Sequence, residues 1–211
     1  DLSGERRWID RGYLGDLRRE NAREDPEGSL ELYRGWMAVR IDDIGAVLDD
    51  LLSGESGAGV RVDPGRIALV GHSLGGSAAL GAARAREDIG AAVALEAPFL
   101  ADITAVEDGR FVWDPDPFPV PVLAVYSDSA WGHLGEWPQY GRNHELLEAP
   151  GGVTVHLEGV GHLHLTDLAL SSPLLTRLLN GHSSSGDARA TLEALNGHVL
   201  RFLDEHLAPA G

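Results

Sequence analysis

The feature of this sequence that points most clearly to a chemical role is a serine set among closely spaced glycines. Residues 66 to 83 read RIALVGHSLGGSAALGAA, in which residues 71 to 75 fit the pattern Gly-x-Ser-x-Gly. The apolar run before the pattern predicts a strand and the small residues after it predict a helix, which is the context that a nucleophile elbow requires. Both glycines, Gly71 and Gly75, are expected because a side chain at either would collide with neighbouring chain in so tight a turn. We therefore expect Ser73 to be a nucleophile, the alternative being a glycine-rich turn that serves only packing.

The two neighbours of this serine have expected roles of their own. The N–H group of Leu74 lies at the N-terminus of the predicted helix, where developing negative charge is favoured, so it is the expected oxyanion donor. His72 occupies the variable position of the pattern. For His72 we expect a packing or hydrogen-bonding role.

A serine hydroxyl needs a base, which is expected on a loop after a strand near the C-terminus. Among nine histidines, His162 fits best, because it lies in LEGVGHLHLTD directly after the predicted strand GVTVHL. His164 is its main rival and otherwise a residue that structures the loop or a pocket. The spacing of these two histidines resembles a metal pair, but no carboxylate or third histidine accompanies them at ligand spacing, so no metal site is predicted.

The base needs a carboxylate that orients it, placed between the serine and the histidine in sequence. Glu96 closes the predicted strand after the elbow helix, and Asp128 closes the next strand. The ends of parallel strands meet at one edge of a sheet, so the elbow geometry does not separate these two residues. Both remain candidates, each with the alternative of being a solvated carboxylate at the end of a strand.

Short apolar strands alternate with helices along the chain, a pattern typical of a parallel sheet with right-handed crossovers. We read one α/β domain over 1–211, whose first part, 1–31, is an irregular charged segment. Strands are expected near 66–71, 91–96, 120–126 and 152–157, and helices over 32–52, 73–87 and 187–207.

Composition excludes several classes of function. The chain has no cysteine and a formal charge of -16, from 33 acidic against 17 basic residues. Such a surface repels nucleic acid phosphates and anionic lipid headgroups. No apolar run approaches the roughly 18 residues that a membrane span needs. We expect no cofactor, no nucleic acid partner and no integral membrane contact, and a small-molecule ester as substrate.

Several blocks of the sequence together resemble the platelet-activating factor acetylhydrolase family of α/β hydrolases. These blocks follow the family in order from about residue 36 to the end: GHSLGGSAAL, AAVALEAPF, GVGHLHLTDLALSSPLL and LNGHVLRFLDEHL. The resemblance implies an α/β-hydrolase fold, with a mainly parallel sheet covered by helices on both faces. It also implies that the triad acid follows the elbow helix, at Glu96, where the family usually has aspartate. The usual position of the triad acid in α/β hydrolases in general favours Asp128 instead.

The resemblance further implies strands upstream of the region matched here, with a loop that supplies a second oxyanion N–H. Nothing before residue 32 reads as an apolar strand. We therefore expect the chain to correspond to the C-terminal two-thirds of the fold, with the elbow strand at one edge of the sheet. An unpaired edge strand invites a partner, either a missing N-terminal segment or a second copy of the chain.

The expected function is that of a serine carboxylic-ester hydrolase acting through an acyl-enzyme on short-chain or phospholipid-like esters. Alternatives are another hydrolase of the same fold, of the amidase, thioesterase or dienelactone hydrolase type, and a non-catalytic fragment. Aromatic residues on the loops that leave the catalytic edge either line an acyl pocket or pack under those loops. They are Phe111, Trp113, Phe118, Trp131 and Trp137, with Trp131 the one expected at the substrate.

Overall fold

The computed structural model describes residues 11–54, 61–148, 153–179 and 186–207. Its strands are β1 (Ala68–His72), β2 (Ala91–Leu95), β3 (Ile103–Glu107), β4 (Arg110–Trp113), β5 (Val122–Ser127) and β6 (Val153–Leu157). Its α-helices are α1 (Arg11–Arg19), α2 (Pro26–Leu52), α3 (Leu74–Ala85), α4 (Asp128–Trp131), α5 (Gly141–Glu148), α6 (Leu168–Ser171), α7 (Pro173–Leu179) and α8 (Ala188–His206). Short 3-10 turns are η1 (Leu100–Asp102), η2 (Pro138–Tyr140) and η3 (His162–Leu165).

Four strands form a parallel sheet in the order β1-β2-β5-β6. Their register places Gly71 beside Ala94, and Val125 between Leu95 and Val155. The four strands expected from the sequence are thus confirmed, and β1, which leads into the elbow, lies at the edge of the sheet among the described strands. Because all four strands run in one direction, their carboxyl ends share one edge, where side chains that follow the strands can meet.

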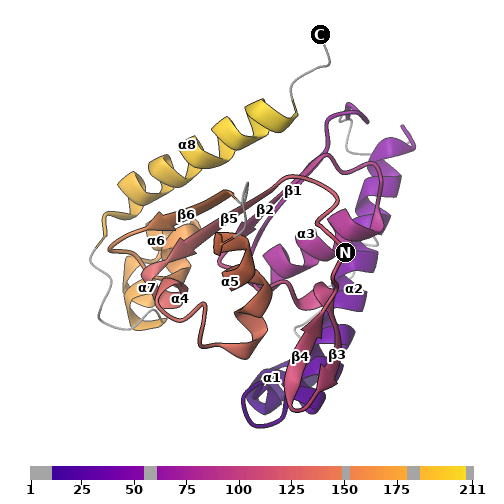
Figure 1. The fold of residues 1–211 in the computed structure, drawn as a ribbon. Coiled ribbons are helices and arrows are strands. Elements are labelled where there is room, and N and C mark those ends of the chain that lie inside the picture. The colour runs from indigo at the N-terminus through magenta and orange to yellow at the C-terminus, as the bar shows by residue number, and fades with distance from the viewer. Residues whose placement is uncertain (1–10, 55–60, 149–152, 180–185, 208–211) are drawn as a thin grey trace.

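Helices cover both faces of this sheet (Figure 1). Alternate residues of β2 divide between the two layers: Val93 and Leu95 pack with Leu195 and Phe202 of α8. Ala94 faces the opposite layer, where Leu80 of α3 packs. Burial on both faces explains why β2 reads as an uninterrupted apolar run rather than an alternating one.

The charged N-terminal part is more regular than expected. The expectation of an irregular segment over 1–31 is wrong for the described residues of that range, which form α1 and the first turns of α2. Helix α2 starts at Pro26, and the Asp25 carboxylate caps it by accepting a hydrogen bond from Gly28 N at 2.9 Å. Aspartate before a proline at the first helical position is a start signal independent of hydrophobic periodicity. Leu30, one turn inside the helix, is buried.

A two-stranded antiparallel hairpin, β3–β4, stands where an aromatic-rich loop was expected from the sequence. Its turn contains Asp108 and Gly109 with φ of 50° and 72°, the conformation that a two-residue hairpin turn requires. Phe111 of β4 lies with its ring centroid 5.9 Å from that of Tyr33. The hairpin therefore packs its aromatic side chains against α2, as part of the core.

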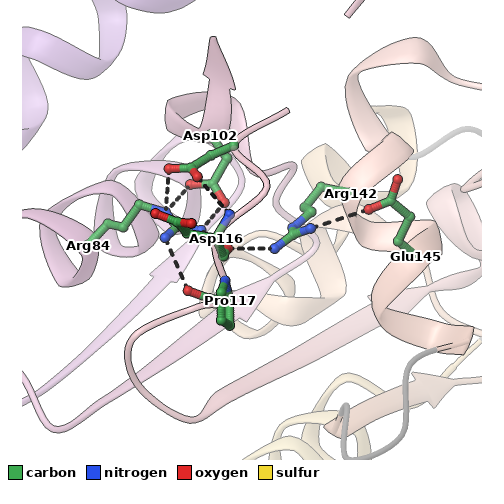
Figure 2. A network of polar contacts seen from close by, with 7 residues as sticks. Arg84, Asp102, Asp116, Pro117, Arg142 and Glu145 are labelled. Carbon is green, nitrogen blue, oxygen red and sulfur yellow. Dashed lines mark hydrogen bonds and ion pairs between the residues drawn. The ribbon is translucent and has the colours of Figure 1, made fainter. Parts of the chain in front are cut away.

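A polar network fixes α3 to the segments that follow β2 (Figure 2). The Arg84 guanidinium donates through Nε and Nη2 to both carboxylate oxygens of the buried Asp102, each at 2.9 Å. Arg84 also donates to the carbonyls of Asp116 and Pro117. Arg142 of α5 donates to the same Asp116 carbonyl at 3.1 Å. The network therefore joins α3, η1, α5 and the connection before β5.

None of the described helices has the length and apolar character needed to cross a membrane.

Candidate active site

Ser73 sits at the sharp turn between β1 and α3, in a backbone conformation that non-glycine residues rarely adopt. Its φ and ψ are 55° and -127°. Such strain persists only where the surroundings hold it, and it clusters at functional sites. Ser73 N–H donates to the carbonyl of Leu95 on the neighbouring strand at 2.9 Å, which anchors the turn to the sheet. The local geometry is that of a nucleophile elbow.

The close approach at this turn depends on a different pair of glycines from the expected one. A Cβ at Gly71 would lie 2.3 Å from the carbonyl oxygen of Gly75, so the expectation for Gly71 is confirmed. The expectation for Gly75 is wrong, because a Cβ there would meet no heavy atom within 4 Å. The second crowded position is Gly76, where a Cβ would lie 2.5 Å from that of Ala97. At Gly76, the first turn of α3 passes close to the end of β1 and to the loop after β2.

His162 begins η3, directly after the loop that follows β6. Its Nδ1 lies 2.9 Å from Oε1 of Glu96. A carboxylate oxygen only accepts, so Nδ1–H is the donor, and Nε2 becomes the ring nitrogen that can take a proton. This tautomer is the one that a general base beside a serine requires.

Glu96 is the carboxylate that the structure pairs with His162. It is 3% exposed, and its φ of 47° is the second strained non-glycine conformation at this edge. Oε2 accepts a hydrogen bond from Ser127 N at 2.8 Å. Burial opposes ionisation of Glu96, but the hydrogen bonds from His162 and Ser127 outweigh it and lower the pKa of the carboxyl. The side chain is thus held as a carboxylate.

Asp128, the other candidate, has different partners. Its Oδ1 lies 2.7 Å from Nε2 of His156, and its Oδ2 accepts a hydrogen bond from Gly159 N at 2.8 Å. The Asp128 side chain is about half exposed. It ties β6 and the following loop to the start of α4.

Two side chains hold the main chain of His162. Nε2 of His72 lies 3.0 Å from the carbonyl oxygen of His162, and because a carbonyl only accepts, Nε2–H donates. The two rings also contact each other, with centroids 4.2 Å apart. On the other side of the residue, His162 N–H donates to Oγ of Ser129 at 3.1 Å. Ser129 was missed in the sequence, since nothing in its surroundings there distinguishes it from a residue of an ordinary turn.

Burial, followed by repulsion from His162, lowers the pKa of His72 to about 4. The ring is therefore neutral near neutral pH. The expected hydrogen-bonding role of His72 takes the form of this contact with the His162 carbonyl.

His164 takes part in the loop rather than in the pair with Glu96. It is 7% exposed, and its Nδ1 accepts a hydrogen bond from Gly161 N at 3.2 Å. It also lines a separate cavity, of about 580 Å³, together with Thr176 and Asp187. These contacts correspond to the loop-structuring alternative for this histidine.

Ser73 lines a cavity of about 260 Å³. Leu74 is also at the wall, and as the first residue of α3 it carries one of the helix N–H groups without an intrahelical acceptor. The other lining residues are Leu17, Glu20, Tyr33, Trp36, Pro98, Leu100, Trp137, Gln139 and Tyr140. Several of these come from α1, α2 and the turn between them, which sequence reasoning had not connected with the site.

Of the five aromatic residues for which pocket lining and ordinary packing were both open, Trp137 is the one at this cavity. Trp131 lies elsewhere, with its ring stacked on that of His156 at 4.5 Å. It is held there because His156 is in turn fixed by Asp128. Phe118 packs edge-on against Phe99 in the core. For most of the set, the alternative of ordinary packing is what the structure shows.

Within the described ranges, the structure contains no group of three or more histidine, aspartate or glutamate side chains placed to hold a metal ion.

Comparison with known proteins gives a likeness among solved structures. No protein-family model and no curated protein matches the chain. Among solved structures, it is similar to a ferulic acid esterase from Streptomyces cinnamoneus, with a TM-score of 0.59 and 23% sequence identity over 92% of this chain. The match covers 53% of the esterase, so the chain spans about half of that protein's length. The parallel sheet, its helices and this likeness show that the chain has the α/β-hydrolase fold.

Proposed function

We propose that the chain is a serine carboxylic-ester hydrolase, with Ser73 as nucleophile, His162 as base and Glu96 as the carboxylate that orients His162. The observation that carries the proposal is the pairing of buried Glu96 with His162, at 2.9 Å, on the sheet edge where Ser73 occupies its strained turn. Packing alone does not account for a buried carboxylate, an oriented imidazole and a strained serine on one edge, because burying a charge and straining a backbone each carry a cost in stability.

In the proposed reaction, the Ser73 hydroxyl attacks the ester carbonyl while His162 Nε2 takes its proton. The Leu74 N–H and the positive end of α3 stabilise the oxyanion of the tetrahedral intermediate. His162 then gives the proton to the leaving alcohol, and an acyl-enzyme remains on Ser73. Water, activated by the same imidazole, releases the acid. Glu96 stays ionised throughout and stabilises the imidazolium that forms in each step.

Three considerations bear on the size and kind of substrate. The cavity of about 260 Å³ lies below the usual range of drug-sized ligand pockets, roughly 300 to 1,000 Å³, which favours a short acyl chain or a small alcohol. The structural neighbour bears the name of a ferulic acid esterase, so an ester of that acid belongs in the test panel. The resemblance to the platelet-activating factor acetylhydrolase family adds a short-chain phospholipid ester to the same test panel.

The proposal is tested by pre-steady-state hydrolysis of p-nitrophenyl acetate. An acyl-enzyme mechanism predicts a burst of nitrophenolate equal to the concentration of sites, which disappears in Ser73→Ala and persists in Ser53→Ala, a control at the exposed end of α2. Anilide, thioester and dienelactone substrates run in parallel separate the ester hydrolase from its amidase, thioesterase and dienelactone hydrolase alternatives. A folded protein that hydrolyses none of these compounds and shows no burst would overturn the proposal.

A further inference from the structure

The cavity beside Ser73 contains a carboxylate that the proposed reaction does not use. Glu20, which follows α1, lines the cavity together with Ser73. Its Oε1 accepts hydrogen bonds from the hydroxyl of Tyr33 and from Ala22 N. In the part of the chain that the structure describes, Oε2 accepts no hydrogen bond and the carboxylate forms no ion pair, not even with nearby Arg23. Among the described residues, the negative charge of Glu20 thus has no cationic partner.

Aromatic rings form much of the remaining wall. Tyr33, Trp36, Trp137 and Tyr140 all line the cavity. They come from two separate parts of the chain, α2 and the region around η2. Aromatic faces attract cations through the ring quadrupole, most strongly where water is largely excluded, and walls of this kind recognise quaternary ammonium groups.

Tyr33 holds the Glu20 carboxylate in position. The Tyr33 side chain is 2% exposed, and its ring packs against those of Trp36 and Phe111. Its hydroxyl donates to Glu20, so the carboxylate is oriented before any ligand arrives. A preorganised charge of this kind binds a ligand without the cost of ordering a mobile side chain.

The charge of the whole molecule acts in the same direction. With a net charge of -16, the protein raises the local concentration of cations and repels anions. An ester with a net negative charge, from a carboxylate or phosphate without an accompanying cation, is therefore disfavoured at this site. A cationic ester is favoured by the local carboxylate, the aromatic wall and the long-range field together.

We propose that Glu20 and the surrounding aromatic residues form a subsite for a positively charged ammonium group of the substrate, so that the site prefers cationic esters. This inference rests on the proposed function for its catalytic part, whereas the binding of the cation does not. The cation can belong to the alcohol or to the acyl part of the ester, and Glu20 is a specificity-determining residue in either case.

The first experiment measures binding without turnover. Choline is titrated into the full chain in a calorimeter, beside its neutral isostere with a tert-butyl group in place of the trimethylammonium group. We expect choline to bind about tenfold more tightly than the isostere. Glu20→Gln keeps an acceptor for Tyr33 and Ala22, and is expected to lose this preference. Glu24→Gln removes the same charge from an exposed residue outside the cavity and is expected to keep it.

The second experiment compares kcat/KM for pairs of isosteric esters. One pair is butyrylcholine and its tert-butyl analogue; the other is a methyl ester of a trimethylammonium-substituted short acid and its tert-butyl analogue. The ratio of cationic to neutral ester, measured on one preparation, is independent of the fraction of active protein. We expect a ratio about tenfold higher in the wild type and Glu24→Gln than in Glu20→Gln. The pair of esters that shows this tenfold difference identifies whether the cation belongs to the alcohol or to the acyl part.

The outcomes separate this inference from the proposed function. Ester hydrolysis with equal ratios in the wild type and Glu20→Gln overturns the cation subsite and leaves the esterase standing. Choline binding that depends on Glu20, in a chain without ester hydrolysis, supports the subsite and contradicts the esterase. Choline that binds no better than its neutral isostere overturns the subsite whatever the hydrolysis result.

Discussion

His72 Nε2–H donates to the carbonyl of His162 at 3.0 Å, so the residue before the proposed nucleophile holds the main chain of the proposed base. The contact joins the end of β1 to η3, the turn after β6; β1 and β6 are the two outer strands of the described sheet. With the hydrogen bond from His162 N–H to Ser129 Oγ, both backbone polar groups of His162 are fixed by side chains. The imidazole is therefore positioned from its main chain as well as by Glu96.

Removing either support is expected to slow the reaction without weakening substrate binding. In His72→Ala and Ser129→Ala we expect kcat to fall about tenfold with little change in KM, because small displacements of a base lower the rate of proton transfer. His72→Gln and Ser129→Thr, which keep a donor and an acceptor respectively, are expected to recover most of the loss. Steady-state kinetics with a p-nitrophenyl ester provides the measurement. A change confined to KM would argue against a positioning role.

The neutral state of His72 has a consequence for stability. Its pKa of about 4 in the folded protein lies below the ordinary value of 6.5, so the unfolded chain binds the proton more readily. The free energy of unfolding is therefore expected to fall as the pH drops from 6.5 towards 4, and to be insensitive to His72 above that window. Glu96 acts at lower pH, since its depressed pKa maintains stability above its ordinary value of 4.5 and loses it below.

Urea unfolding of the wild type and His72→Gln at pH 7.5 and pH 5 measures this difference. The wild type is expected to lose about 1 to 2 kcal/mol more than the variant between these two conditions, allowing for partial solvent contact of the ring. Equal losses in the two proteins would show that His72 is not buried in its neutral form.

The crowding at the elbow predicts opposite effects at adjacent glycines. Gly76→Ala is expected to destabilise the fold by about 1 to 3 kcal/mol, because its Cβ would overlap Ala97 and the Gly71 carbonyl. Gly75→Ala is expected to be neutral or to stabilise α3 by up to about 1 kcal/mol, since its Cβ enters open space within a helix. Thermal unfolding of the two variants checks the contrast, and a larger loss at Gly75 would contradict the described turn.

The polar network in Figure 2 predicts that its carboxylates contribute unequally to the free energy of unfolding. Asp102→Ala leaves the Arg84 guanidinium without its buried carboxylate and is expected to cost about 3 kcal/mol. Glu145→Ala removes a carboxylate that is 61% exposed, and is expected to cost less than about 1 kcal/mol. Chemical denaturation of both variants provides the comparison, and similar costs would contradict the structural role of the Asp102 pair.

The sequence was sufficient to predict the four parallel strands, because buried strands flanked by turn residues form continuous apolar runs. It also indicated the elbow, since the motif lay between a predicted strand and a predicted helix. The β3–β4 hairpin was missed although Asp108-Gly109 is a strong turn signal, because the aromatic residues around it suggested a pocket. The start of α2 was missed because its first turns are charged.

The elbow geometry did not separate Glu96 from Asp128 in the sequence, for a physical reason. Both end neighbouring strands at the same edge, and what separates them is the direction of each side chain, which depends on the turn after each strand. At Glu96 the backbone adopts a positive φ, and the buried side chain meets Ser127 N and His162. Asp128 begins α4 instead and pairs with His156. Such tertiary contacts leave no periodic signal in the chain.

The proposed function requires Ser73, His162 and Glu96 to form one site, and labelling with a fluorophosphonate probe tests this directly. Peptide mapping is expected to find the label on Ser73 of the wild type, and none on Ser73→Ala. In Glu96→Gln the amide favours the wrong His162 tautomer, so the labelling rate is expected to fall by roughly 10³ to 10⁴, whereas Asp128→Asn stays within about tenfold of the wild type. A folded wild type that takes no label, or a collapse of the rate in Asp128→Asn rather than Glu96→Gln, would contradict this assignment of the site.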